Sequence, residues 1–216
     1  MAKANSCYMC GEEATSSEHV PARCFFPKES EYRKQLITVP SCRRHNEDTS
    51  SHDEYVRNFI TTHEANNHLA FRQFKEKVTE SLKRSRWMIG PAIKIHTPKG
   101  IVYGIQIQRP IFDKILRKIA YALYFYTYGT PWNRDLIILT KHLVYSDLST
   151  DDYGKLITAA EVVLPPLPAN GKNPQVFKYS FLNGGENPDN AVLCMTFYEG
   201  FTVWLTVVQG STIFRF

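Results

Sequence analysis

Two short couples of metal-binding residues lie near the N-terminus. Cys7 and Cys10 are separated by two residues, and Cys42 and His45 repeat that spacing. Two ligands at this spacing can point at one ion from a single tight turn, and thiolate with imidazole is the ligand chemistry of structural zinc. The alternative is four unrelated residues in a reduced core. The pattern predicts one tetrahedral zinc site, and the 31 residues between the couples leave room for a further element.

A carboxylate and an imidazole stand side by side inside that interval, at Glu18 and His19. A histidine with a pKa near neutrality can take a proton from water, and a carboxylate can hold a divalent cation. Asn46, which directly follows the last zinc ligand, offers a neutral oxygen as a second cation ligand. Alone, such a dipeptide is typical of a solvated surface pair. Its position inside the predicted zinc loop favours a chemical role.

The order of these motifs resembles one known family. C-x-x-C, then E-H-V-P, then L-I-T-V-P-x-C with a following asparagine, and then an acidic helix start with tyrosine, is similar to the HNH endonucleases of the zinc-stapled ββα-metal type. The resemblance covers about residues 5–65. The matching residues are Cys7, Cys10, Glu18, His19, Val20, Pro21, Leu36, Cys42, His45 and Asn46.

The resemblance implies a metal-dependent endonuclease that hydrolyses phosphodiester bonds of DNA. His19 would be the general base, and Glu18 and Asn46 would hold a single catalytic Mg²⁺ or Mn²⁺. The three cysteines and His45 would hold structural zinc. Free-standing proteins of this kind resemble restriction or phage-defence effectors. RNA as the substrate is not distinguished from DNA, because hydrolysis of either backbone asks for the same groups.

The chain departs from the family pattern at three positions. Glu18 stands where the family usually has aspartate, His45 replaces a cysteine, and the bracing asparagine of the loop is Gln35 or absent. The residues that follow offer alternative cation ligands, although charges in the first turn of a helix are the favoured interpretation for them. These residues are Asp48, His52 and Asp53.

Basic residues cluster at two places that would suit a nucleic-acid backbone. Lys75 and Lys77 are equally well explained as a solvated helix face. Contacts to phosphate supply most nonspecific affinity for nucleic acid. The predicted contact residues are Arg43, Arg44, Lys83, Arg84 and Arg86.

A non-catalytic zinc module that binds nucleic acid or protein is the alternative function. Such a module needs neither Glu18 nor Asn46 beside a cation, so a second metal site separates the two hypotheses. A homodimer and a regulatory protein partner both stay open.

The overall composition excludes few classes of function. The net charge of +5 is spread evenly, with 14 basic and 12 acidic residues in 1–90 and 12 and 9 in 91–216. No stretch has the length of a membrane span, and the first ten residues lack the apolar core of a signal peptide. Five cysteines, two of them in C-x-x-C, favour a reduced compartment. We therefore expect a cytoplasmic protein without a membrane partner.

The expected fold class is α+β, with the zinc-bound ββα-metal motif followed by helices and a C-terminal antiparallel sheet. We divide the chain into an HNH domain (1–65), a basic helical connector (66–90) and an α+β domain of unknown role (91–216). Apolar spacing predicts helices after residue 50 and after residue 67, the second with Phe71, Phe74, Val78 and Leu82 inside.

The C-terminal part is expected to begin with a hairpin over 92–108 and a helix from Pro110 to Gly129, which buries an apolar stripe that includes Tyr126. A strand is predicted over 134–140, a short helix over 151–161 and a loop over 165–174. An antiparallel meander is predicted from 175–182, 191–200, 201–208 and 211–216.

Overall fold

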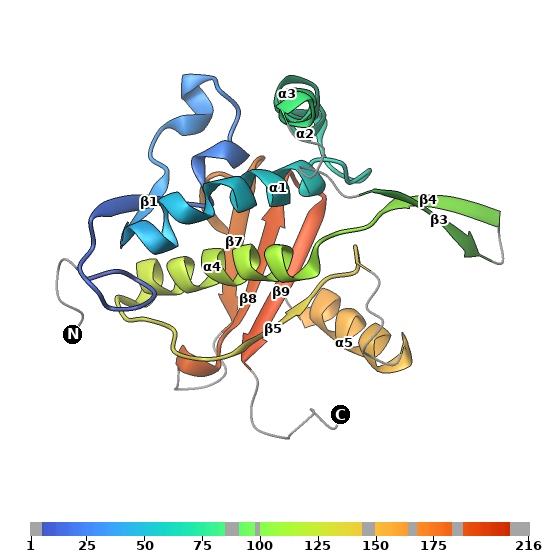
Figure 1. The fold of residues 1–216 in the computed structure, drawn as a ribbon. Helices are drawn as coiled ribbons and strands as arrows, with labels where there is room; N and C mark the ends of the chain where they lie inside the picture. Colours follow the sequence, from blue (N-terminus) through green and yellow to red (C-terminus); the bar gives the residue numbers. More distant parts are fainter. Residues whose placement is uncertain are drawn as a thin grey trace.

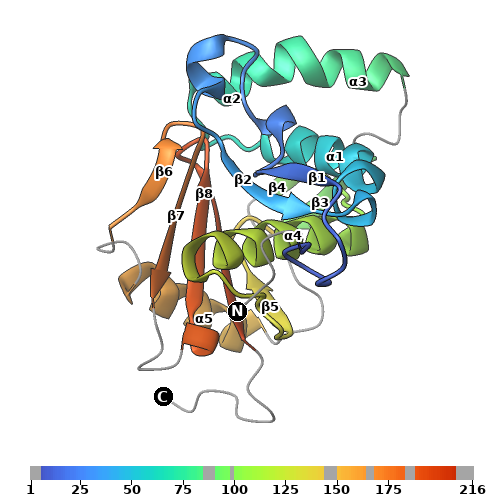
Figure 2. The same cartoon turned by 90° about the vertical axis from the view of Figure 1, so that its left-hand side faces the viewer.

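The computed structural model describes residues 6–84, 91–97, 100–143, 150–163, 168–182 and 188–207. Its elements form layers around one long helix (Figure 1). The helix α4 (Arg109–Tyr128) lies between the N-terminal segment on one side and a five-stranded sheet on the other (Figure 2). Pro110 stands in its first turn, and Gly129 ends it in the left-handed conformation with φ 72°. This helix is the element that joins the two halves of the chain.

The N-terminal segment contains a β-hairpin and a helix. Strand β1 (Ser16–Val20) pairs antiparallel with β2 (Ile37–Ser41), and short 3-10 turns then lead into α1 (Ser50–Ile60). The strands alternate in burial, so that Glu18 and Val39, which face each other across the ladder, point inward. The hairpin packs against α4 on this inner face. The helix after the hairpin completes a β-β-α arrangement.

A second helical region follows at α2 (His68–Gln73), a π-helical turn (Phe74–Val78) and α3 (Thr79–Arg84). Asn67 caps α2 by accepting a hydrogen bond from the backbone N–H of Leu69 at 3.1 Å. Val78 is buried as expected, but Phe71 is 60% exposed, so its predicted place on the inner face is wrong. The inner face of α2 consists of Leu69, Ala70 and Gln73 instead.

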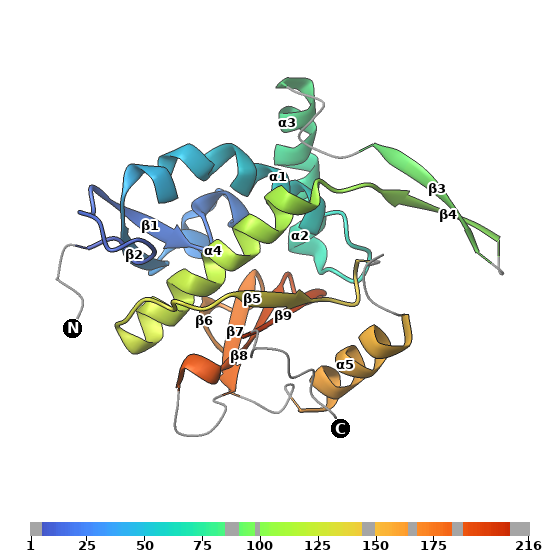
Figure 3. The ribbon, with the colours of Figure 1, turned by 60° about the horizontal axis from the view of Figure 1, so that its bottom comes forward.

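The next element is a two-stranded ribbon that projects from the body (Figures 1 and 3). Strands β3 (Ala92–Thr97) and β4 (Gly100–Ile105) pair antiparallel over six residue pairs, which confirms the predicted hairpin. Ile93, Lys94, His96 and Ile101 are exposed on it. The ribbon therefore offers its side chains to solvent or to a partner.

The C-terminal sheet has the strand order β5-β9-β8-β7-β6, and all its pairings are antiparallel. The expected strands are present, but β6 lies in a stretch predicted as loop, and residues 211–216 lie outside the described part of the chain. The bounds are β5 Leu136–Leu139, α5 Thr150–Val163, β6 Asn170–Asn173, β7 Phe177–Leu182, β8 Val192–Phe197 and β9 Phe201–Val207.

One face of this sheet packs on α4, and α5 covers part of the other. Leu193, Met195 and Val203 are completely buried toward α4, together with Ile115 and Leu123 of the helix. The helix predicted from Pro110 to Gly129 thus buries most of its expected apolar stripe, although Tyr126 is 52% exposed and its expected burial is wrong. Buried residues from both halves of the chain form one continuous cluster. The hairpin and the sheet therefore share a core through α4.

Candidate metal centre

The four predicted zinc ligands meet at the open end of the β1–β2 hairpin. The ligand atoms of Cys7, Cys10, Cys42 and His45 all lie within 4.8 Å of one another. The Sγ atoms of Cys10 and Cys42 are 3.8 Å apart, and Nδ1 of His45 lies 3.3 Å from Sγ of Cys42. A zinc ion held at about 2.3 Å by sulfur and about 2.0 Å by nitrogen sets its ligand atoms roughly 3.5–3.8 Å apart. The cluster can therefore hold a metal ion such as zinc, as the spacing predicts.

Local backbone structure positions the two couples. The turn after Cys7 closes with a hydrogen bond from the N–H of Gly11 to the carbonyl of Cys7, and Gly11 has the positive φ of 73° that this turn requires. Tyr8 donates its N–H to the carbonyl of Pro40, which ties the turn to β2. Cys42 precedes a 3-10 turn over Arg43–His45, not the start of α1. Burial lowers the pKa of His45, which favours the neutral imidazole that a metal needs.

The proposed base, His19, lies on the outer face of the hairpin, opposite Thr38. Its side chain is half-buried, and its Nδ1 atom is buried without a hydrogen-bond partner. Burial lowers the pKa of His19, and the positive charges of Arg23 and Arg33 lower it further. At neutral pH the imidazole is therefore uncharged and able to accept a proton. The effect of these two arginines was missed in the sequence, because only the folding of the loop after β1 brings their charges near His19.

The proposed cation ligand Glu18 lies on the opposite face of the same strand, since successive side chains of a strand alternate. It is 3% exposed, and its Oε1 atom lies 2.8 Å from Nζ of Lys118 on α4. Asp53 of α1 contacts the same ammonium at 2.7 Å. Burial raises the pKa of Glu18 to about 7, against the opposing effect of Lys118. Nothing in the sequence pattern pointed to Lys118, which was one charged position on an apolar helix.

Asn46 lies at the same inner edge of β1 as Glu18. Its Nδ2 atom donates to Oγ of Ser16 at 2.9 Å and to the carbonyl of Ser17 at 3.4 Å. The side chain therefore fastens the segment after the zinc ligands to the beginning of β1. The structure thus places Asn46 at the beginning of β1, and it places Glu18 and His19 on opposite faces of that strand.

The predicted basic residues fall into three groups. Arg43 lies 3.6 Å from Glu47 and 3.5 Å from Asp48, Lys83 pairs with Glu80, and Arg84 pairs with Glu54. Arg44 is exposed. Arg86 lies outside the described residues. Exposed pairs of this kind contribute little to stability.

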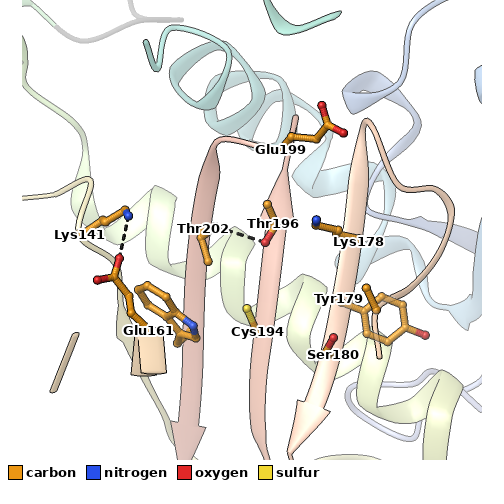
Figure 4. Close-up of a pocket in the computed structure, with 11 residues that line it drawn as sticks. Lys141, Glu161, Lys178, Tyr179, Ser180, Cys194, Thr196, Glu199 and Thr202 are labelled. Carbon is orange, nitrogen blue, oxygen red and sulfur yellow. Dashed lines mark hydrogen bonds and ion pairs between the residues drawn. The ribbon is translucent and has the colours of Figure 1, made fainter. Parts of the chain in front are cut away.

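Apart from the Cys/His cluster, a concave region lies on the outer face of the C-terminal sheet, away from α4 (Figure 4). It is a cavity of about 300 Å³ whose floor includes Cys194 and the mutually hydrogen-bonded hydroxyls of Thr196 and Thr202. The pair Lys141–Glu161, 2.7 Å apart, forms one wall. This cavity shares no residue with the metal centre.

Comparisons with protein-family models, with curated proteins and with solved structures found no match to this chain. Among the described residues, no helix has the length and apolar character needed to cross a membrane.

Proposed function

We propose that this protein is an HNH-type endonuclease that hydrolyses phosphodiester bonds of DNA, with His19 as the general base. The observation that carries the proposal is the setting of His19. A hairpin joined to the Cys/His cluster presents this imidazole on its outer face, half-exposed, with a lowered pKa and two arginines close by. A neutral imidazole at such a position can take the proton of an attacking water.

The arginines would draw the phosphate backbone toward the base. Arg23 is exposed, and Arg33 is held by hydrogen bonds to the carbonyls of Pro27, at 2.7 Å, and Phe26, at 3.3 Å. A guanidinium fixed in this way loses little freedom when it contacts phosphate. In this proposal Arg33 orients the backbone, and His19 removes the proton of the water.

Mg²⁺ or Mn²⁺ would be the catalytic cofactor, held by Glu18 and Asn46. When bound, such an ion neutralises charge on the phosphate in the transition state. The donor chemistry suits it, because Oε2 of Glu18 is a buried carboxylate oxygen without a hydrogen-bond partner. The other oxygen of Glu18 contacts Lys118, so this carboxylate accepts the ion only after that contact changes.

DNA would lie along the basic region that includes α3 and the projecting ribbon. No acidic residue occurs between Glu80 and Asp113, whereas six lysines and arginines do. A two-stranded ribbon fits the major groove of a duplex. Lys94 is exposed on this ribbon, so the ribbon is suited to contact duplex phosphates or groove edges.

One observation favours the second candidate, a zinc module that binds nucleic acid or protein without catalysis. Lys118 already contacts both Glu18 and Asp53, so the inner face of the hairpin holds a cationic group without any added ion. In that case the hairpin would serve as a rigid platform for binding. The two candidates differ in whether the chain cleaves.

A cleavage assay with purified protein, plasmid DNA and Mg²⁺ or Mn²⁺ tests the proposal. His19→Ala is expected to abolish cutting while leaving the zinc content unchanged. Thr38→Ala is the matched control, because Thr38 is the exposed cross-strand neighbour of His19. If His19→Ala cuts as fast as the parent protein, the assignment of the base is wrong. Duplex binding without cutting by the parent protein would favour the second candidate.

A further inference from the structure

The ammonium of Lys118 is surrounded by three oxygen acceptors. Nζ lies 2.8 Å from Oε1 of Glu18, 2.7 Å from Oδ2 of Asp53 and 2.7 Å from Oγ1 of Thr49. An ammonium has three N–H donors, so each donor has one partner. Lys118 itself is 3% exposed. The ammonium of Lys118 therefore occupies the place that a small bound cation would take among these oxygens.

The two carboxylates around this ammonium keep spare acceptor capacity. Oε2 of Glu18 and Oδ1 of Asp53 are both buried without a hydrogen-bond partner. The hydroxyl of Tyr8, whose pKa is raised by burial and by the charges of Glu18 and Asp53, is also buried and unpartnered. Two carboxylates against one ammonium leave negative charge uncompensated. Their oxygens are of the hard type that Mg²⁺ and Mn²⁺ prefer.

Each member of this group comes from a different element. Glu18 lies on β1 of the hairpin, Asp53 on α1 and Lys118 on α4, and α4 contacts both of the other elements. The ammonium therefore reaches the N-terminal motif from the helix that carries the C-terminal sheet. Figure 1 labels α1 and α4, which are in contact with each other.

We propose that Lys118 is a positioning residue that occupies the cation position between Glu18 and Asp53, so that these carboxylates bind a divalent ion only when the lysine is withdrawn. An ammonium and a divalent ion repel each other at contact distance, so they compete for the same carboxylates. The C-terminal half of the chain thereby controls the cation site through α4. The consequence for cleavage rests on the proposed function, whereas the competition between the ammonium and the divalent ion can be measured by binding alone.

The test is Mn²⁺ binding by the full-length, zinc-loaded protein, measured by the loss of the free Mn²⁺ signal in electron paramagnetic resonance. Without DNA, the parent protein is expected to leave the signal unchanged, because Lys118 still contacts both carboxylates. Lys118→Met is expected to bind one Mn²⁺ per chain, and adding Glu18→Gln is expected to abolish that binding. Lys114→Met is the matched control, because it removes the same charge from an exposed position on the same helix.

Thermal unfolding gives a second readout, since an ion that binds only the folded state raises the melting temperature. Lys118→Met leaves two buried carboxylates without their cation, so it is expected to melt at a lower temperature than the parent protein. Mn²⁺ is expected to recover part of that loss in the variant and to leave the parent protein unchanged. Lys118→Gln, which keeps an N–H donor without the charge, serves where the methionine variant does not fold.

Two results would overturn the inference. One is a parent protein that binds Mn²⁺ in the absence of DNA in a manner dependent on Glu18. The other is that neither Lys118→Met nor Lys118→Gln binds Mn²⁺. This result counts against the inference both when the variants fold without Mn²⁺ and when they stay unfolded in the presence of Mn²⁺. Loss of the proposed nuclease function has a different signature, because the variants would then gain the Mn²⁺ site and still leave plasmid DNA intact.

Discussion

The imidazole rings of His63 and His142 lie with their centroids 4.0 Å apart in an edge-to-face arrangement. His63 follows α1, and His142 follows β5, so the contact joins the N-terminal segment to the C-terminal sheet. Nε2 of His142 accepts a hydrogen bond from the N–H of Thr202 at 3.1 Å, which requires the neutral ring. Protonation of either histidine places positive charge against the other ring. The junction between the two halves is therefore sensitive to acid.

The first prediction is a loss of stability in mild acid. Burial lowers the pKa of His142 to about 4, with His63 and Lys141 adding to the effect and Glu161 opposing it. The unfolded chain binds this proton near pH 6.5, so the contribution of His142 is complete above that pH and is lost as the pH falls toward 4. The urea midpoint is expected to decline over this interval.

His142→Gln keeps an acceptor for Thr202 and removes the titrating ring, so its urea midpoint should depend less on pH between 6.5 and 4. His96→Gln, on the exposed ribbon, is the control and should follow the parent protein. Equal pH profiles for the parent protein and His142→Gln would contradict the assignment.

The second prediction concerns the zinc cluster. Cys42→Ser removes one thiolate from a four-ligand set, so the purified protein is expected to contain less than one zinc per chain and to unfold at a lower temperature. A strong chelator should shift the parent protein in the same direction. Cys194→Ser is the control, because Cys194 lies on the outer face of the sheet, away from the cluster. Full zinc content in Cys42→Ser would exclude this residue as a ligand.

The third prediction concerns the turn between β8 and β9. A Cβ atom at Gly200 would lie 2.4 Å from the carbonyl carbon of Ala65. Asn67 also holds this turn, since its N–H donates to the carbonyl of Tyr198 at 2.9 Å. Because the clash is with backbone, Gly200→Ala is expected to lower the free energy of unfolding by about 3 kcal/mol, the upper end of the usual cost of overpacking.

Gly154→Ala is the matched control for that change. Gly154 lies inside α5, and a Cβ there meets nothing within 4 Å. The same substitution is expected to raise the free energy of unfolding by about 0.5–1 kcal/mol, because alanine loses less backbone entropy in a helix. Urea unfolding of both variants checks the pair. Equal changes in the free energy of unfolding for Gly200→Ala and Gly154→Ala would mean that the turn at Gly200 relaxes away from Ala65.

The fourth prediction concerns the ribbon. Lys94→Glu is expected to weaken binding to a short DNA duplex and to reduce the salt dependence of binding by about one phosphate contact. Fluorescence anisotropy at several salt concentrations measures both quantities. Lys172→Glu, at an exposed position on β6, makes the same charge change far along the chain and should have a smaller effect. If both variants bind equally, the ribbon does not contact the duplex.

Much of the architecture was predictable because it depends on local signals. Pro110 and Gly129 mark the two ends of α4, and alternating apolar residues mark β8 and β9. The zinc cluster was predictable for the same reason, since two ligands of each couple stand on one turn. Phe71 and Tyr126 were misplaced because helical periodicity shows which residues share a face but not how wide the covered part of that face is.

The residue types and spacing of Cys7, Cys10, Cys42 and His45 predicted a cluster that could hold a metal ion, and the structure brings these four residues together. Glu18 and His19 face opposite ways because they are successive residues of β1, and the bounds of that strand came from the tertiary structure. Only the tertiary structure decided what each of them meets, because those partners come from distant positions. Lys118 reaches Glu18 from α4, while Arg33 reaches the neighbourhood of His19 from the loop before β2. Charge pairs between distant positions produce no periodic pattern in the sequence, so only the folded structure shows them.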